Sequence, residues 1–308
     1  MSSQPVILVE QLHKSFGGVH ALRGVDLSVP GGSTFGLVGP NGAGKTTLFS
    51  VISGFLQPTR GKVAVLGGSL SGAVLRGRLG VLPQDARWRK SVALGRQMII
   101  CARLQGMSHS EAQKDVMRVL ALTGMEAYFN RAPDKLSHGM AKRVAIAQAF
   151  LGEPEVILLD EPLAGLDPAQ ARSIRLLIQK ETGKRTFIIS SHVMADIEAL
   201  CSHVAIIKEG EIVAQPSMDE LTRREGVAVF VLDKPPEEAL KKSFEALDYV
   251  SKVELRKVER KLQITVRTDQ MHIDEAIAAF IHILIEQKTT FVSINKGTSL
   301  EDAVLQVT

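Results

Sequence analysis

The chain has 308 residues, of which 45% are hydrophobic and 23% charged, and its formal net charge is +4. This composition favours one large or two ordinary globular domains over a disordered chain. The basic residues are spread along the sequence instead of forming a block, which is typical of a solvated surface and argues against a nucleic-acid partner. The two cysteines, Cys101 and Cys201, fit neither a disulfide framework nor a zinc site.

The N-terminal segment MSSQPVILVEQLHKSF lacks the basic region and long apolar stretch of a secretory signal, which predicts a cytoplasmic protein. The most apolar later runs, AIAAFIHILI and QMIICARL, fall short of the ~20 residues that span a bilayer, and they are typical of helices that face a core. We therefore expect any membrane role to depend on a partner.

Short apolar runs separated by turn signals predict strands up to about residue 80: PVILVE, ALRGVDLSVP, STFGLVG, GKVAVLGG and LGVLPQ. The third ends in a glycine-rich turn that leads into KTTLFSVISGFL, which has helical spacing. The pattern is helical from Ser91 to about Leu151, with candidate N-caps at Ser108, Ser110 and Ser137. EVILLDEP, RTFIISSH and HVAIIKEGEIVAQ follow as strands, with a helix over residues 168–181. Apolar strands that alternate with helices favour a parallel sheet covered on both faces.

A concentration of charge in MDELTRREG, residues 218–226, predicts a boundary between a domain of residues 1–220 and one of residues 221–308. The second domain is predicted to contain a strand (VAVFVLD), a helix (236–247), two strands joined across Arg260 (VSKVELRKVE and KLQITVRT), a helix (273–287) and a strand (TFVSIN). This βαββαβ order is the plan of α+β, ferredoxin-like domains. The segment carries no glycine-rich loop, carboxylate pair or ligand cluster, so we expect an accessory or regulatory role.

GPNGAGKTT satisfies the phosphate-binding pattern G-x-x-x-x-G-K-[ST] between a predicted strand and a predicted helix. Its residues are Gly39, Pro40, Asn41, Gly42, Ala43, Gly44, Lys45, Thr46 and Thr47. The glycines allow backbone N–H groups to surround phosphates, Lys45 can reach the β and γ oxygens, and Thr46 can offer its hydroxyl to Mg²⁺. A turn that merely caps a helix would explain Gly42 and Gly44 but not the lysine followed by two threonines.

VILLDEP supplies the acidic residues that such a loop requires. Asp160 follows four apolar residues and is predicted to be a magnesium ligand at the end of a strand. Glu161 lies directly beyond it, where a carboxylate can polarise an attacking water as a general base, an effect of roughly 10²- to 10⁴-fold in rate. Phosphoryl transfer would otherwise rest on positioning and charge neutralisation.

With these motifs the chain resembles the nucleotide-binding subunit of an ATP-binding-cassette transporter over roughly residues 5–220. The resemblance implies an α/β fold: a P-loop NTPase core with a mostly parallel sheet, an antiparallel β subdomain, and a helical subdomain at about residues 88–150. It implies that Phe16 stacks on adenine, that Gln84 connects magnesium and water to the helical subdomain, and that His192 is the switch at the γ-phosphate. Asp167, in LAGLDP, matches the loop exchanged between subunits.

LSHGM, residues 136–140, occupies the position of the family signature, usually Leu-Ser-Gly-Gly-Gln, which contacts the γ-phosphate bound by the opposite subunit. Ser137 and Gly139 match this signature, whereas His138 and Met140 depart from it. Leu163 also departs, because threonine or serine is usual there. Considered alone, Ser137 is fully explained as a helix N-cap, so the capping and the phosphate-binding interpretations both stay open.

The resemblance implies an ATPase that uses ATP and Mg²⁺, dimerises head to tail with a second copy or a related subunit, and powers a separate membrane permease from the inner face of the membrane. The C-terminal extension, ending in SLEDAVLQV, resembles subunits of ABC-2 type exporters and favours export. DARWRKSVALGRQM is implied as the permease-binding surface, although its Trp88 would equally suit the packing of the helical subdomain. The alternatives are a soluble cassette ATPase without a permease and a nucleic-acid-associated ATPase, for which no basic stripe or heptad run is present.

Overall fold

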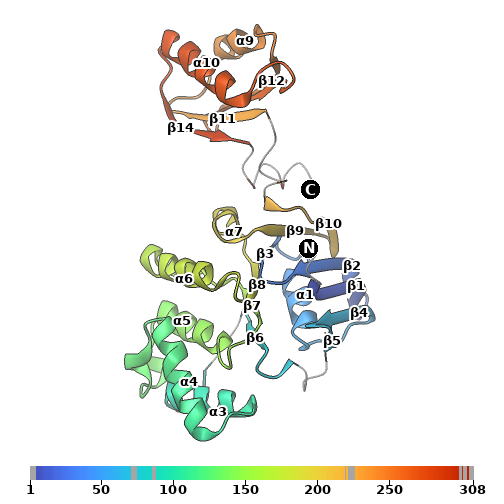
Figure 1. Cartoon of the computed structure of the whole chain (residues 1–308), viewed down its shortest axis with the longest axis vertical. Helices are drawn as coiled ribbons and strands as arrows, with labels where there is room; N and C mark the ends of the chain where they lie inside the picture. The colour runs from blue at the N-terminus through green and yellow to red at the C-terminus, as the bar shows by residue number, and fades with distance from the viewer. Residues whose placement is uncertain are drawn as a thin grey trace. The chain divides into compact units, whose positions relative to one another are not determined.

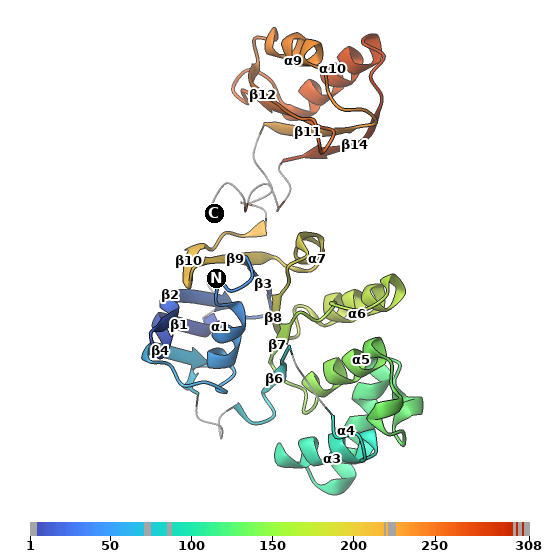
Figure 2. The same ribbon diagram turned by 180° about the vertical axis from the view of Figure 1, so that it is seen from behind.

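The computed structural model describes residues 5–70, 75–84, 88–218, 220, 226–297, 300 and 304. The chain divides into two compact units, Met1–Pro216 and Ser217–Val307 (Figures 1 and 2). The boundary predicted between residues 220 and 221 adjoins residues 221–225, which lie outside the described part. No helix within the described ranges combines the length and the apolar character that crossing a bilayer requires.

Ten strands belong to the first unit: β1 (Pro5–Phe16), β2 (Val19–Pro30), β3 (Thr34–Val38), β4 (Arg60–Val65), β5 (Gly68–Ser69), β6 (Leu79–Leu82), β7 (Val156–Asp160), β8 (Thr186–Ser190), β9 (His203–Lys208) and β10 (Glu211–Ala214), counted over its described residues. Its helices are α1 (Lys45–Ile52), α3 (Leu94–Leu104), α4 (His109–Leu122), α5 (His138–Ala149), α6 (Pro168–Glu181) and α7 (Met194–Leu200), with 3₁₀ turns η1 (Glu126–Tyr128) and η2 (Pro133–Lys135).

The central sheet of the first unit has the order β10-β9-β3-β8-β7-β6, and all its neighbouring strands are parallel except β9 and β10. Every residue of β3, β7 and β8 is buried, as expected for strands covered on both faces. The carboxyl ends of parallel strands lie at one edge of a sheet. The loop after β3, Asp160 at the end of β7 and Ser190 at the end of β8 therefore share that edge.

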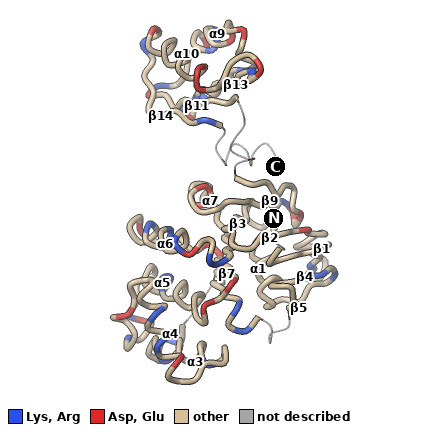
Figure 3. The backbone as a smooth tube through the Cα atoms, viewed as in Figure 1, with Lys and Arg blue, Asp and Glu red and all other residues tan. Residues whose placement is uncertain are grey.

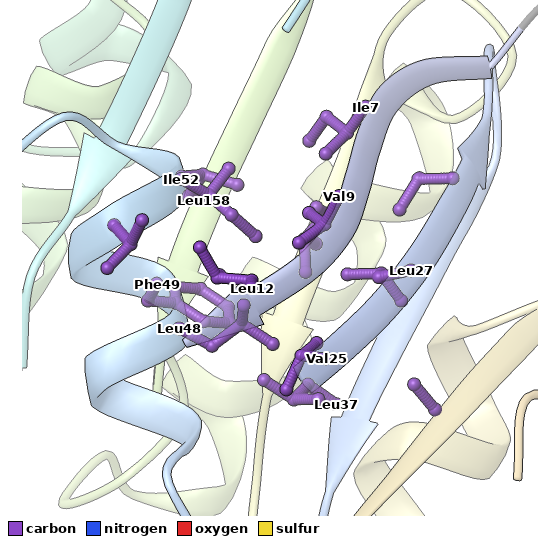
Figure 4. Close-up of a cluster of buried hydrophobic side chains, with 14 of the residues drawn as sticks. Ile7, Val9, Leu12, Val25, Leu27, Leu37, Leu48, Phe49, Ile52 and Leu158 are labelled. Atoms are coloured by element: carbon purple, nitrogen blue, oxygen red, sulfur yellow. The ribbon is translucent and has the colours of Figure 1, made fainter. Parts of the chain in front are cut away.

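A second, antiparallel sheet, in the order β2-β1-β4-β5, packs with α1 and the central sheet around one hydrophobic core. Figure 4 shows Leu48 and Phe49 of α1 beside Leu12 of β1, with Leu158 of β7 in the same cluster. Strand β1 continues to Phe16, beyond the predicted run PVILVE, because it pairs with both β2 and β4 although its second half is polar. This packing holds α1, and the loop before it, against the central sheet.

Helices α3, α4 and α5 lie together in the first unit, in the region predicted to be helical (Figure 1). Of the candidate caps, Ser108 begins α4 through a capping box with Glu111, and the Ser137 hydroxyl accepts a hydrogen bond from the Met140 N–H at the start of α5. Ser110 is not a cap, since it lies inside α4, and the capping box fixes the start two residues earlier.

The second unit comprises β11 (Val227–Leu232), α9 (Glu238–Glu245), β12 (Val250–Arg256), β13 (Lys261–Val266), α10 (Ile273–Glu286) and β14 (Phe291–Lys296). Its antiparallel sheet has the order β12-β13-β11-β14. Phe280 of α10 lies at the centre of its own core and contacts the rings of Phe230, Phe244 and Tyr249. Helix α9 is shorter than predicted at both ends.

Candidate functional site

The loop between β3 and α1 lies so close to neighbouring backbone that it requires glycine at two positions. A Cβ atom added to Gly39 would lie 2.1 Å from the carbonyl oxygen of Ile207. Gly44 has a φ of +109°, and an added Cβ would lie 2.8 Å from the carbonyl oxygen of Ala21. The sequence therefore adopts this tight turn because side chains are absent where the backbone of β9 and β2 approaches.

Lys45, the first residue of α1, is buried, with 9% of its surface exposed. Its Nζ donates hydrogen bonds to the carbonyl oxygens of Gly39 at 2.7 Å and Pro40 at 3.0 Å. Burial lowers the pKa of this ammonium group, while the charges of Glu161 and Asp160 act in the opposite direction. A buried cation with carbonyl partners at the mouth of a glycine-rich loop is suited to receive an anion.

A cavity of about 320 Å³ opens beside this loop. It is lined by Ala21, Asn41, Gly42, Gly44, Lys45, Thr46, Thr47, Gln84, Asp160 and Glu161. All of these except Ala21 were predicted from the sequence. Ala21 lies on β2, where its backbone approaches Gly44. Nothing in the sequence around Ala21 indicates that it lines a cavity. The Thr46 hydroxyl lies 3.4 Å from Gln84 Oε1.

The two carboxylates at the end of β7 are held by the segment that ends β8. Asp160 is 3% exposed and its Oδ1 accepts a hydrogen bond from the Ser190 hydroxyl. Glu161 has a φ of +50°, and its Oε2 lies 2.9 Å from Nδ1 of His192. Ser190 was not predicted from the sequence. The one feature that could have indicated its role is a hydroxyl at the end of an apolar strand that was expected to lie parallel to the strand of Asp160.

Other predicted site residues lie outside this cavity, whose lining among the described residues does not include Phe16, Ser137, Gly139 or Asp167. Phe16 is 48% exposed, with Nζ of Lys14 5.0 Å from its ring centroid. Ser137 and Asp167 cap helices: the Asp167 carboxylate accepts from the Gln170 N–H at 2.9 Å. Within one chain, these two side chains therefore serve local capping.

One departure from the family signature, His138, lies next to the loop that contains Asp167. A Cβ added to Gly165, which has a φ of +76°, would lie 2.6 Å from Nε2 of His138, so this ring covers the glycine. A Cβ added to Gly139 would lie 2.3 Å from the Gln170 amide oxygen. Leu163 is buried, with 8% exposed, and packs as an apolar residue where a hydroxyl is usual in the family. The start of α5 and the 163–167 loop are thus packed together.

The family described as ABC transporter matches residues 22–164. The linearmycin resistance ATP-binding protein LnrL of Bacillus subtilis (strain 168) is 30% identical over an alignment of 283 residues that covers 89% of this chain and 89% of that one. The chain belongs to the ATP-binding proteins of ABC transporters. The Nod factor export ATP-binding protein I of Paraburkholderia xenovorans (strain LB400) is 29% identical over 311 residues, which cover 99% of this chain and 97% of that one.

Among solved structures, an ATP-binding subunit of an ABC transporter superposes on this ABC ATPase with a TM-score of 0.65 and 26% identity, over 70% of this chain and 91% of the other. The predicted P-loop NTPase cassette and the predicted ATPase activity are confirmed by these matches. The loop that satisfies the phosphate-binding pattern forms part of the wall of the 320 Å³ cavity.

Proposed function

We propose that this ABC ATPase powers export through a separate membrane permease, at the inner face of the membrane. Relatives named for linearmycin resistance and Nod factor export support this function over that of a soluble ATPase without a permease. The similarity to the Nod factor export protein covers 99% of this chain and so includes the second unit. The strand order β14-β11-β13-β12, with two helices in crossover positions, supports a ferredoxin-like fold for that unit, with an accessory or regulatory role.

ATP and Mg²⁺ fit the groups that surround the cavity. Thr46, Gln84 and Asp160 bring hydroxyl, amide and carboxylate oxygens to it, the ligands that magnesium prefers, and Lys45 brings a buried cation for phosphate. Bound Mg²⁺ would neutralise charge on the phosphate oxygens. Backbone N–H groups of the loop and of α1 would hold the phosphates in place, since helix N-termini bind anions.

Glu161 is the proposed general base, and its contact with His192 is the observation that carries the hydrolytic mechanism. The carboxylate lines the cavity, and His192 lies 2.9 Å from its Oε2. A carboxylate at this position can accept a proton from water, while the imidazole holds its orientation. His192 remains exposed, so its other nitrogen is available to the γ-phosphate.

The predicted site residues that do not line the cavity suit a head-to-tail dimer with a second copy or a related subunit. These residues are Phe16, Ser137, Gly139 and Asp167. Ser137 and Gly139 lie at the N-terminus of α5, whose dipole and N–H groups favour an anion such as the γ-phosphate held by the partner. Asp167 is the N-cap of α6. It belongs to the 163–167 loop, which packs against the start of α5. Phe16 presents an exposed ring that is available to stack on adenine.

The Glu161→Gln variant tests this function. It should bind ATP as the parent does, because the amide keeps the shape of the side chain, and it should lose nearly all hydrolysis, because an amide does not accept the proton. Size-exclusion chromatography with Mg–ATP should then show a stable dimer. Glu153→Gln is the matched control, since Glu153 also has a positive φ of 56° and does not line the cavity. Hydrolysis by Glu161→Gln at the parental rate would rule out Glu161 as the base.

A further inference from the structure

Ser190 lies beside Asp160 because β7 and β8 are parallel and these two residues are register partners at the ends of their strands. The Ser190 side chain is fully buried, and its hydroxyl donates to Oδ1 of Asp160, which is itself 3% exposed. A buried carboxylate is stabilised by donors of this kind, which also fix the plane of its two oxygens. The hydroxyl therefore leaves Asp160 one defined orientation at the cavity.

The same hydroxyl is an acceptor for the next residue. The backbone N–H of Glu161 donates to Ser190 Oγ at 3.0 Å and to the Ser190 carbonyl oxygen at 3.2 Å. Glu161 has a φ of +50°, a left-handed conformation that is unfavourable for a residue other than glycine. Hydrogen bonds from a fixed strand end can hold such a turn. One serine thus contacts both residues that follow the apolar part of β7.

We propose that Ser190 is a positioning residue for hydrolysis: its hydroxyl orients the Asp160 carboxylate toward the metal site and holds the Glu161 backbone so that the Glu161 side chain faces the cavity. This inference rests on the roles proposed above for Asp160 and Glu161. Ser190 itself does not line the cavity among the described residues, so it acts through these two residues. If Ser190 only filled space, a side chain of similar size without a hydroxyl would serve equally well.

Threonine and valine have the same shape, so the pair Ser190→Thr and Ser190→Val isolates the hydroxyl. We expect kcat of Ser190→Val to fall at least about fivefold, with KM for ATP within about twofold of the parent, because the loss concerns alignment. Ser190→Thr should stay within about twofold of the parent in both constants. Both variants carry the same extra methyl group, which cancels in the comparison.

A second measurement does not depend on turnover. The parental thermal midpoint should rise more with Mg–ATP than with ATP and a chelator, because ligands stabilise the state they bind. In Ser190→Val this magnesium-dependent increment should shrink by at least about half, whereas Ser190→Thr should retain it. If the added methyl group prevents folding, Ser190→Ala, which adds no volume, should reproduce both effects of the valine.

Ser33→Ala controls for the removal of a buried serine hydroxyl elsewhere, since Ser33 donates to the Pro30 carbonyl oxygen at 2.7 Å. It should keep the parental kcat and magnesium increment. If Glu161→Gln abolishes hydrolysis but Ser190→Val and Ser190→Thr behave alike, the role of Ser190 is overturned while the proposed function stands. Parental hydrolysis by Glu161→Gln would instead overturn the proposed function.

Discussion

Lys45 shows how a buried cation affects the stability of the nucleotide-free protein. Its pKa is lowered chiefly by burial, so the folded chain binds this proton less tightly than the unfolded chain does. Below the lowered folded pKa the lysine is charged in both states, and its desolvation destabilises the fold. As pH rises from the lowered folded value toward the ordinary value for lysine, this cost is relieved.

The prediction is a difference in slope between the parent and Lys45→Met. Without nucleotide, the unfolding free energy of the parent relative to Lys45→Met should increase over the alkaline range as pH rises toward the ordinary lysine pKa, by less than about 1.4 kcal/mol per pH unit. Urea unfolding across this range measures it, and groups other than Lys45 titrate equally in both proteins. A difference in unfolding free energy that stays constant with pH would show that the burial of Lys45 does not destabilise the fold.

At the scale of elements, the contact between β6 and α5 depends on the absence of a single side chain. A Cβ added to Gly80 of β6 would lie 1.9 Å from the carbonyl oxygen of Ala149 at the end of α5. Since backbone atoms cannot move away as a flexible side chain can, Gly80→Ala should separate the helix from the strand. We expect a loss of about 2 kcal/mol or more in unfolding free energy.

Gly18→Ala is the control for this substitution, because no atom lies within 4 Å of an added Cβ at Gly18, and its φ is not positive. Chemical unfolding of the two variants should give a large change for Gly80→Ala and less than about 0.5 kcal/mol for Gly18→Ala. Equal small effects would show that α5 can shift away from β6 at little cost.

We propose that helix α3 and the residues just before it form the surface that contacts the permease. Residues 88–107 contain four basic residues and no acidic one, whereas both signs are interspersed over the chain as a whole (Figure 3). Ile100 and Leu104 lie one turn apart on α3 and are 51% and 72% exposed. Trp88 is half-buried with its Nε1 enclosed, so part of its ring packs within this region. Arg87, also predicted for this surface, lies outside the described residues.

The corresponding prediction is that Arg89→Glu weakens copurification with the permease by at least about threefold, because a reversed charge repels an acidic partner. ATP hydrolysis by the isolated subunit should be unchanged, since Arg89 does not line the cavity. Lys180→Glu on α6 is the charge-matched control. Undiminished recovery of the permease with Arg89→Glu would exclude this face as its binding surface.

Local signals predicted elements well, and nonlocal pairing limited the prediction of the site. Helix α6 runs from Pro168 to Glu181 as predicted, because Asp167 and Pro168 are a strong N-terminal signal for a helix. The phosphate-binding loop is likewise one continuous stretch. Ser190, however, lies 30 residues from Asp160, and its contact arises from the register of β7 and β8, which no local pattern reveals.

On the scale of the whole molecule, the two units have separate hydrophobic cores, so each should unfold as its own cooperative transition. In calorimetry, Mg–ATP should raise the midpoint of the first unit's transition and leave that of the second unit unchanged, because the cavity belongs to the first unit. Phe280→Ala should lower the other midpoint, with a cost of about 3–5 kcal/mol for a buried phenylalanine. A single transition that responds to both changes would show that the units unfold together.

Strands β11 and β14, the first and last strands of the second unit's sheet, lie side by side, since the Gly297 N–H donates to the Val227 carbonyl oxygen at 2.8 Å and Ala228 pairs with Lys296. Residues 227 and 297 are therefore close enough to be joined by a short glycine linker, and new termini can be opened in the turn between β12 and β13, where Val258 is 99% exposed. A circularly permuted form of residues 227–297 should consequently keep its native fold. The same closeness means that residues 227–297 can be inserted into an exposed loop of an unrelated host protein without stretching that loop.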